Sequence, residues 1–160
     1  MARRLGSGLA LLFLLTAWPR AASHEFSVKL QGPNTAVKSG SEVHVKATIT
    51  NTSGREIRFA VGFGNNEFDY DVEVADAHGH VPPSTPEFRD LWQNKSPRWG
   101  SYATRVLKPG EFFDEDLVVT HLYTLGPGEY TVRVTRGIRA HDGSSPESVK
   151  SNFIHSTVTK

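Results

Sequence analysis

The chain has 160 residues, a formal net charge of +1 and no cysteine. This length favours one domain, because domains usually hold roughly 100–200 residues. The lack of cysteine excludes disulfide scaffolds, thiolate zinc sites, iron–sulfur centres and a cysteine nucleophile. The balanced charge argues against nucleic acid as a partner, because nucleic-acid binding needs a concentrated basic surface.

The first 23 residues have the three parts of a secretory signal peptide. Arg3 and Arg4 form a basic start, residues 9–15 form an apolar core, and Ala21-Ala22-Ser23 supplies small residues before a cleavage point. The core is too short to span a membrane, which takes about 20 apolar residues. We expect cleavage after Ser23. The product would be a secreted or periplasmic chain of about 137 residues, with a formal charge of −2 and no membrane attachment.

Most of the remaining chain alternates between apolar and polar residues, which is typical of half-buried β-strands. The clear runs lie at 26–30, 43–49, 57–61, 68–74 and 130–134, and the weaker ones at 104–107, 112–119 and 152–159. No stretch has a helical period over three turns, and residues 87–93 could make one helical turn at most. We therefore expect residues 24–160 to form one all-β domain, an immunoglobulin-like antiparallel β-sandwich with Greek-key topology and seven to eight strands.

Turn residues separate these runs and refine the fold. Pro109-Gly110 and Pro127-Gly128 have the form of type II turns, in which the glycine takes a positive φ. Tyr130 follows the second turn at the start of a strong strand, which predicts a tyrosine corner, a hydroxyl bonded to nearby backbone. In the core we expect four buried residues from different strands: Ile49, Phe59, Val72 and Val132.

Residues from about 40 to 137 resemble a known family. The segments ITNTSGREIRFAVG, FDYDVEVADAHGH, VLKPGEFF and GPGEYTVRV occur in that order. Together they are similar to the bacterial intracellular proteinase inhibitor (BsuPI) family of immunoglobulin-like domains. The resemblance implies the sandwich fold and raises proteinase inhibition as a function. The chain departs from the family in its export signal and in having Val81-Pro82-Pro83-Ser84 after the hairpin.

The stretch 81–103 is the best candidate for binding. It has no strand period, is rich in proline, and is long for a loop in a compact domain. Its aromatic and arginine side chains are of the types that dominate binding surfaces. The candidate binding residues are Phe88, Arg89, Trp92, Arg98, Trp99 and Tyr102. The alternative is that these aromatics form a lid over one end of the sandwich.

Histidines suggest a different function. Cleavage after Ser23 would leave His24 at the N-terminus, where an amine and an imidazole could bind copper with a second histidine, as in a histidine brace. His78 and His80 could share a zinc ion, although a solvated turn is the simpler interpretation. Our leading expectation is that the protein holds no cofactor or metal, with copper as the alternative.

The acidic residues and the N-glycosylation sequons are expected to occupy ordinary surface and loop positions. Glu67, Asp69, Asp71 and Glu73 would line one face of one strand, opposite Arg58, Lys46 or Arg133 on neighbouring strands. Residues 114–116 (Asp-Glu-Asp) are expected at the surface. Two formal N-glycosylation sequons, at Asn51 and Asn94, are interpreted as ordinary loop residues.

Catalysis is not expected, because G-x-S-x-G (in the mature chain), HExxH, P-loop and GxGxxG motifs are missing from the sequence. Two functions stay open. The first is an exported, monomeric, non-catalytic module that binds a protein or a glycan. Proteinase inhibition is one form that this binding could take. The second is an exported copper protein that uses His24.

Overall fold

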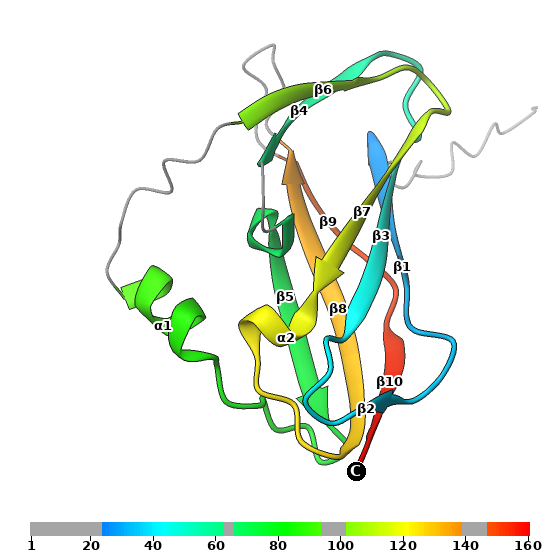
Figure 1. The fold of residues 1–160 in the computed structure, drawn as a ribbon. Coiled ribbons are helices and arrows are strands. Elements are labelled where there is room, and N and C mark those ends of the chain that lie inside the picture. The colour runs from blue at the N-terminus through cyan, green and yellow to red at the C-terminus, as the bar shows by residue number, and fades with distance from the viewer. Residues whose placement is uncertain (1–23, 63–65, 94–101, 139–146) are drawn as a thin grey trace, which may run out of the picture.

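The structure is a computed structural model that describes residues 24–62, 66–93, 102–138 and 147–160, with residues 91–93 described by their backbone (Figure 1). The described residues form an all-β, immunoglobulin-like sandwich, as the alternation predicted. They contain ten strands rather than seven or eight, because two short strands add to the predicted set. The predicted signal peptide at 1–23 lies outside the described residues.

The first sheet consists of three antiparallel strands. Strand β3 (His44–Asn51) lies between β1 (Phe26–Gln31) and β7 (Phe112–Val118). The register places Ile49 opposite Val28 on one side and Phe113 on the other. Since side chains alternate between faces, Val28 and Ile49 point together into the core.

The second sheet has the order β2-β10-β8-β5, with β9 paired to the far half of β8. Its bounds are β2 (Val37–Lys38), β5 (Tyr70–Asp76), β8 (Gly128–Ile138), β9 (Glu147–Lys150) and β10 (Ile154–Thr159). The pairs are antiparallel except β2 with β10, which is parallel. Strand β5 is at the edge of this sheet, and among the described residues it pairs with β8 alone.

A two-stranded sheet, β4 (Ile57–Gly62) with β6 (Tyr102–Leu107), crosses one end of the sandwich (Figure 1). The described residues also contain three short helices: η1 (Asn66–Asp69), α1 (Pro86–Gln93) and α2 (Val119–Leu122). Helix α1 has eight residues, so the prediction of at most one turn was too short. Its start has a recognisable signal: the Phe88 N–H donates to Thr85 Oγ1 at 3.2 Å, and Pro86 occupies the first helical position.

The core lies between the two larger sheets. Ile49 and Val132 are fully buried, and Phe59 and Val72 are 4% and 6% exposed, so all four predicted core residues are confirmed. Burying a side chain of this size contributes roughly 1.5–3 kcal/mol each. Because the sequence has no cysteine, this packing holds the sheets together without a disulfide.

The turns confirm two predictions and correct one. The Tyr130 hydroxyl donates to the Gly126 carbonyl at 2.9 Å, which is the predicted tyrosine corner. Gly110 has a φ of 80°, and the Glu111 N–H donates to the Lys108 carbonyl, as a type II turn requires. Gly128 also has a positive φ, as predicted, but its value of 159° is outside the range of a type II turn because Gly128 already belongs to β8.

Candidate functional site

A pocket of about 690 Å³ lies between the edge of the second sheet and helix α1. Strand β5 and η1 form one wall, α1 forms the opposite wall, and the end of α2 closes it. The residues that line it are Phe68, Asp69, Tyr70, Asp71, Val72, Ser84, Phe88, Arg89, Leu122 and Tyr123. Pockets of this size are typical of small-ligand and peptide-side-chain sites.

Three aromatic rings give the pocket its apolar character. Phe88 of α1 stacks on Phe68 of η1 with ring centroids 6.1 Å apart, and it meets the Tyr123 ring at 5.9 Å with a tilt of 59°. Tyr123 is held in place because its hydroxyl donates to the Val72 carbonyl at 3.0 Å. Such offset and tilted pairs are preferred geometries, so the three rings form a preorganised surface.

Charged groups flank these rings. Arg89 is exposed on α1 next to Phe88, and Asp71 is exposed on β5 across the pocket. Asp69 is already engaged, because its carboxylate accepts from the Gly62 N–H at 2.8 Å and lies 3.7 Å from the Arg136 guanidinium. The pocket therefore presents a cation on one wall and an anion on the other.

The structure brings together part of the predicted binding set. Phe88 and Arg89 line the pocket. Trp92 lies on α1, but only its backbone is described, and Arg98 and Trp99 lie outside the described residues. Tyr102 begins β6, is 51% exposed and does not line the pocket. Phe68 and Tyr123 were missed as binding residues. Phe68 was assigned to the alternating run 68–74, and Tyr123 lies in no such run, so no local signal marks either of them.

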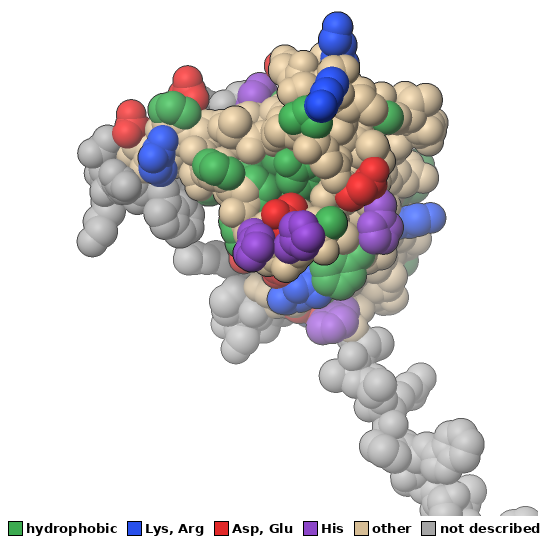
Figure 2. Space-filling view, turned by 90° about the horizontal axis from the view of Figure 1, so that it is seen from below, with side chains coloured by type: hydrophobic (Ala, Val, Ile, Leu, Met, Phe, Trp, Pro, Cys, Tyr) green, Lys and Arg blue, Asp and Glu red, His purple; other side chains and the backbone are tan. Residues whose placement is uncertain are grey.

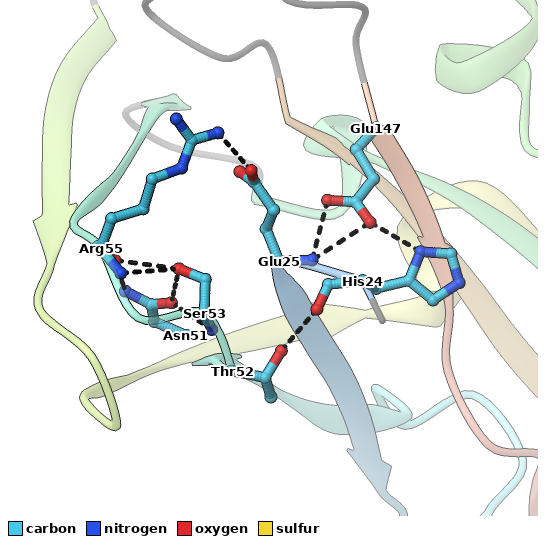
Figure 3. A network of polar contacts seen from close by, with 7 residues as sticks. All are labelled: His24, Glu25, Asn51, Thr52, Ser53, Arg55 and Glu147. Carbon is cyan, nitrogen blue, oxygen red and sulfur yellow. Dashed lines mark hydrogen bonds and ion pairs between the residues drawn. The ribbon is translucent and has the colours of Figure 1, made fainter. Parts of the chain in front are cut away.

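His24 lies beside a carboxylate in this structure. Its Nδ1 atom is 2.6 Å from Glu147 Oε1, and Glu147 also accepts from the Glu25 N–H (Figure 3). The Thr52 hydroxyl donates to the His24 carbonyl at 2.8 Å. Copper binding at His24 stays a prediction, and among the described residues the side-chain partner of His24 is Glu147.

The same network gives Asn51 a structural role (Figure 3). Asn51 is 1% exposed, and its amide donates to the carbonyls of Arg55 and Leu107. Its side-chain oxygen accepts from the Ser53 N–H at 2.9 Å. This buried amide ties the end of β3 to the turn that follows, so Asn51 is a buried strand residue and not the loop residue that was expected. The second sequon, at Asn94, lies outside the described residues.

The predicted acidic row does not form as one strand face. Glu67 and Asp69 belong to η1, and only Asp71 and Glu73 lie on β5. Glu73 pairs with Arg133 and Lys150, as predicted for Arg133. The other two predicted partners pair elsewhere, Lys46 with Asp114 and Arg58 with Glu56.

Glu115 is buried, contrary to the expectation of surface charge for residues 114–116. It is 3% exposed and accepts a hydrogen bond from the Tyr70 hydroxyl between the two sheets. Burial raises the pKa of Glu115, while the hydrogen bond from Tyr70 opposes that rise. Arg136, 4% exposed, donates to the carbonyls of Asp69 and Ala60 nearby.

Histidines gather beside acidic and hydrophobic side chains on the face shown in Figure 2. His78 and His80 lie in an exposed turn, with ring centroids 6.0 Å apart and both backbone N–H groups donating to Asp76. Within the described ranges, no three histidine, aspartate or glutamate side chains are grouped as metal ligands. The exposure of this turn agrees with the solvated-turn interpretation of His78 and His80.

Comparisons with known proteins concern the fold. No protein-family model and no curated protein sequence matches the chain. Among solved structures it is similar to the C-terminal domain of wzt (TM-score 0.47, 9% identity, 86% of this chain and 75% of that one). It is also similar to a PapD-like domain of human CEP192 (TM-score 0.40, 9% identity, 96% and 100%).

A third similar structure is a β-glucosidase from Listeria innocua (TM-score 0.42, 17% identity, 85% of this chain). This chain covers 16% of that enzyme. These likenesses assign no activity to this chain.

None of the helices in the described part of the chain has the length and apolar character needed to cross a membrane.

Proposed function

We propose that this protein is an exported, non-catalytic immunoglobulin-like module that binds a protein segment in the pocket between β5 and α1. The three aromatic rings in contact in this pocket, Phe68, Phe88 and Tyr123, carry the proposal. Apolar and aromatic side chains are recognised by such preformed rings, and Arg89 and Asp71 would orient the polar groups of the same ligand.

The position of β5 favours a polypeptide as the ligand. Residues 70–72 of this edge strand line the pocket. An extended segment lying along an edge strand can bond to its backbone while placing alternate side chains into a neighbouring pocket. A glycan could also stack on the rings, and it is the alternative that the experiment below separates.

The resemblance to the BsuPI family supports testing proteinases among the candidate partners. A proteinase would insert or present a surface loop at the pocket. Export of the chain would place it among extracellular or periplasmic proteinases. The test measures substrate hydrolysis by serine, cysteine and metalloproteinases with and without the protein. Unchanged hydrolysis rates would refute inhibition but not binding.

The binding test uses a displayed peptide library and a glycan array, both probed with the wild-type protein. Any peptide recovered is titrated against wild type, Phe88→Ala and Arg89→Glu. Phe153→Ala is the matched control, because Phe153 is an exposed aromatic packed under Arg133 outside the pocket. We expect at least tenfold weaker binding for both pocket variants and unchanged binding for the control. Equal affinity of all four proteins would refute this site, and recovery of glycans alone would favour the alternative ligand.

A further inference from the structure

Five side chains form an alternating row of carboxylates and imidazoles, which we name the imidazole row. Its members, in spatial order, are Asp116, His44, Glu42, His121 and Glu67. The first three contacts are His44 Nδ1 to Asp116 at 2.8 Å, His44 Nε2 to Glu42 at 3.0 Å, and His121 Nε2 to Glu42 at 3.5 Å. The row ends with His121 Nδ1, 2.7 Å from Glu67 Oε1.

The two ends of the imidazole row differ in burial. At one end Asp116, His44 and Glu42 have side chains that are about half exposed. At the other end the Glu67 side chain is 2% exposed, and among the described residues its polar partner is His121. A buried carboxylate interacts more strongly with a charged partner than an exposed one does, because water screens it less.

The contact between Glu67 and His121 joins two walls of the pocket. Glu67 precedes Phe68 and Asp69 in η1, and His121 precedes Leu122 and Tyr123 at the end of α2. Those four neighbours all line the pocket. A change in the strength of the Glu67–His121 contact therefore acts directly on the relative position of η1 and α2.

Protons can reach this contact from solvent. His121 is 39% exposed and also lines a smaller cavity of about 240 Å³ on the other side of Tyr123. Histidine is the side chain that ordinarily changes charge between pH 5 and 8. When both histidines are neutral the row carries three negative charges, and when both are protonated it carries one.

We propose that protonation of His121 tightens the contact between α2 and η1, so that the pocket is closed more firmly at mildly acidic pH. Neutral His121 can still donate a hydrogen bond to the Glu67 carboxylate, but protonation adds a positive charge to the donor, and the attraction between opposite charges strengthens the contact. The other charged groups nearby are Glu42, His44 and Asp116 along the row, and Asp69, Asp71 and Arg89 at the pocket. The hydrogen bond that His44 donates to Asp116 raises the pKa of His44.

Hydrogen exchange of single amides, followed by NMR from pH 5.5 to 8, tests this proposal. The reporters are the Tyr123 N–H, bonded to the Val119 carbonyl, and the Thr85 N–H, bonded to the Leu122 carbonyl. Their protection factors are referred to a core amide of β3. We expect wild-type protection to fall about fivefold as pH rises, because neutral His121 loses its attraction between opposite charges with Glu67.

The variants separate this device from general pH effects. His121→Gln keeps a neutral donor, so its protection should be low and independent of pH. Glu67→Gln removes the negative charge, so its protection should also be independent of pH. If one of these two variants fails to fold, the other still tests the proposal. His78→Gln, in an exposed turn, is the control and should keep the wild-type slope. A flat wild-type profile, or a slope retained in both His121→Gln and Glu67→Gln, would refute the proposal.

A link to ligand affinity rests on the proposed function, and the two can fail separately. If a peptide binds the pocket, its affinity should be about fivefold higher at pH 5.5 than at pH 8 in wild type and unchanged in His121→Gln. If protection depends on pH but no ligand binds the pocket, the His121–Glu67 proposal is supported and the proposed function is refuted. If a ligand binds the pocket but protection does not depend on pH, the proposed function is supported and the His121–Glu67 proposal is refuted.

Discussion

Removing the Tyr70 hydroxyl tests the role of the buried carboxylate between the sheets. In Tyr70→Phe the ring keeps its volume, and Arg136 can keep its place 5.0 Å from the ring centroid. Only the hydrogen bond to Glu115 is lost. The other carboxylate oxygen of Glu115 has no hydrogen-bond partner among the described residues, so the variant leaves a buried carboxylate without a donor.

The cost should be about 1–3 kcal/mol at neutral pH, the penalty for a buried acceptor that loses its partner. It should also depend on pH. Burial raises the pKa of Glu115 in the folded protein, and the hydroxyl of Tyr70 holds that rise in check. A group whose folded pKa is raised stabilises the fold below its unfolded pKa, near 4.3, and loses that contribution as pH rises. Without the hydroxyl the folded pKa rises further, so the loss in Tyr70→Phe should be small near pH 4 and full at neutral pH.

Urea unfolding of wild type and Tyr70→Phe at several pH values between 4 and 8 measures this difference. Tyr123→Phe is the matched control, because its hydroxyl donates to an uncharged carbonyl, that of Val72. We expect its loss of stability to be the same at every pH. An equal loss at all pH values in Tyr70→Phe, or a matching slope in the control, would refute the reasoning about Glu115.

Three further predictions concern packing, a turn and a surface histidine. Ile49→Ala should lower the free energy of unfolding by about 2–5 kcal/mol, since the residue is fully buried, and an unchanged melting temperature would place the core elsewhere. Gly110→Val should destabilise because of its φ of 80°, whereas Gly54→Ala, in open space, should change the melting temperature little. His44→Gln should lose stability mainly below about pH 6.5, the ordinary pKa of histidine. The hydrogen bond to Asp116 raises the pKa of His44 in the folded protein, so His44 stabilises the fold below about pH 6.5 and loses this contribution as pH rises through the raised pKa. The effect should be small because the side chain is about half exposed, and equal melting-temperature differences at pH 5.5 and 8.5 would contradict it.

Local sequence patterns predicted eight of the ten strands in the described residues. Period-two alternation is a property of neighbouring residues, so it predicted the core positions Ile49 and Val132 and the tyrosine corner at Tyr130. The same pattern, followed strictly along β7, would place Glu115 on the inward face with Leu117. The prediction placed Glu115 at the surface because of its charge and not by its position in the alternation, and it was therefore wrong.

The sequence by itself determined an all-β sandwich without disulfides and the general region of the candidate site around Phe88 and Arg89. The tertiary structure decided which residues complete that site. Glu67 and His121 lie 54 positions apart in the chain, and no local period relates them. Their contact exists because the packing of η1 against the end of β7 and α2 brings together segments that the chain keeps far apart. The pocket arises in the same way, since its walls come from β5, α1 and α2 and only the packing of these elements encloses it.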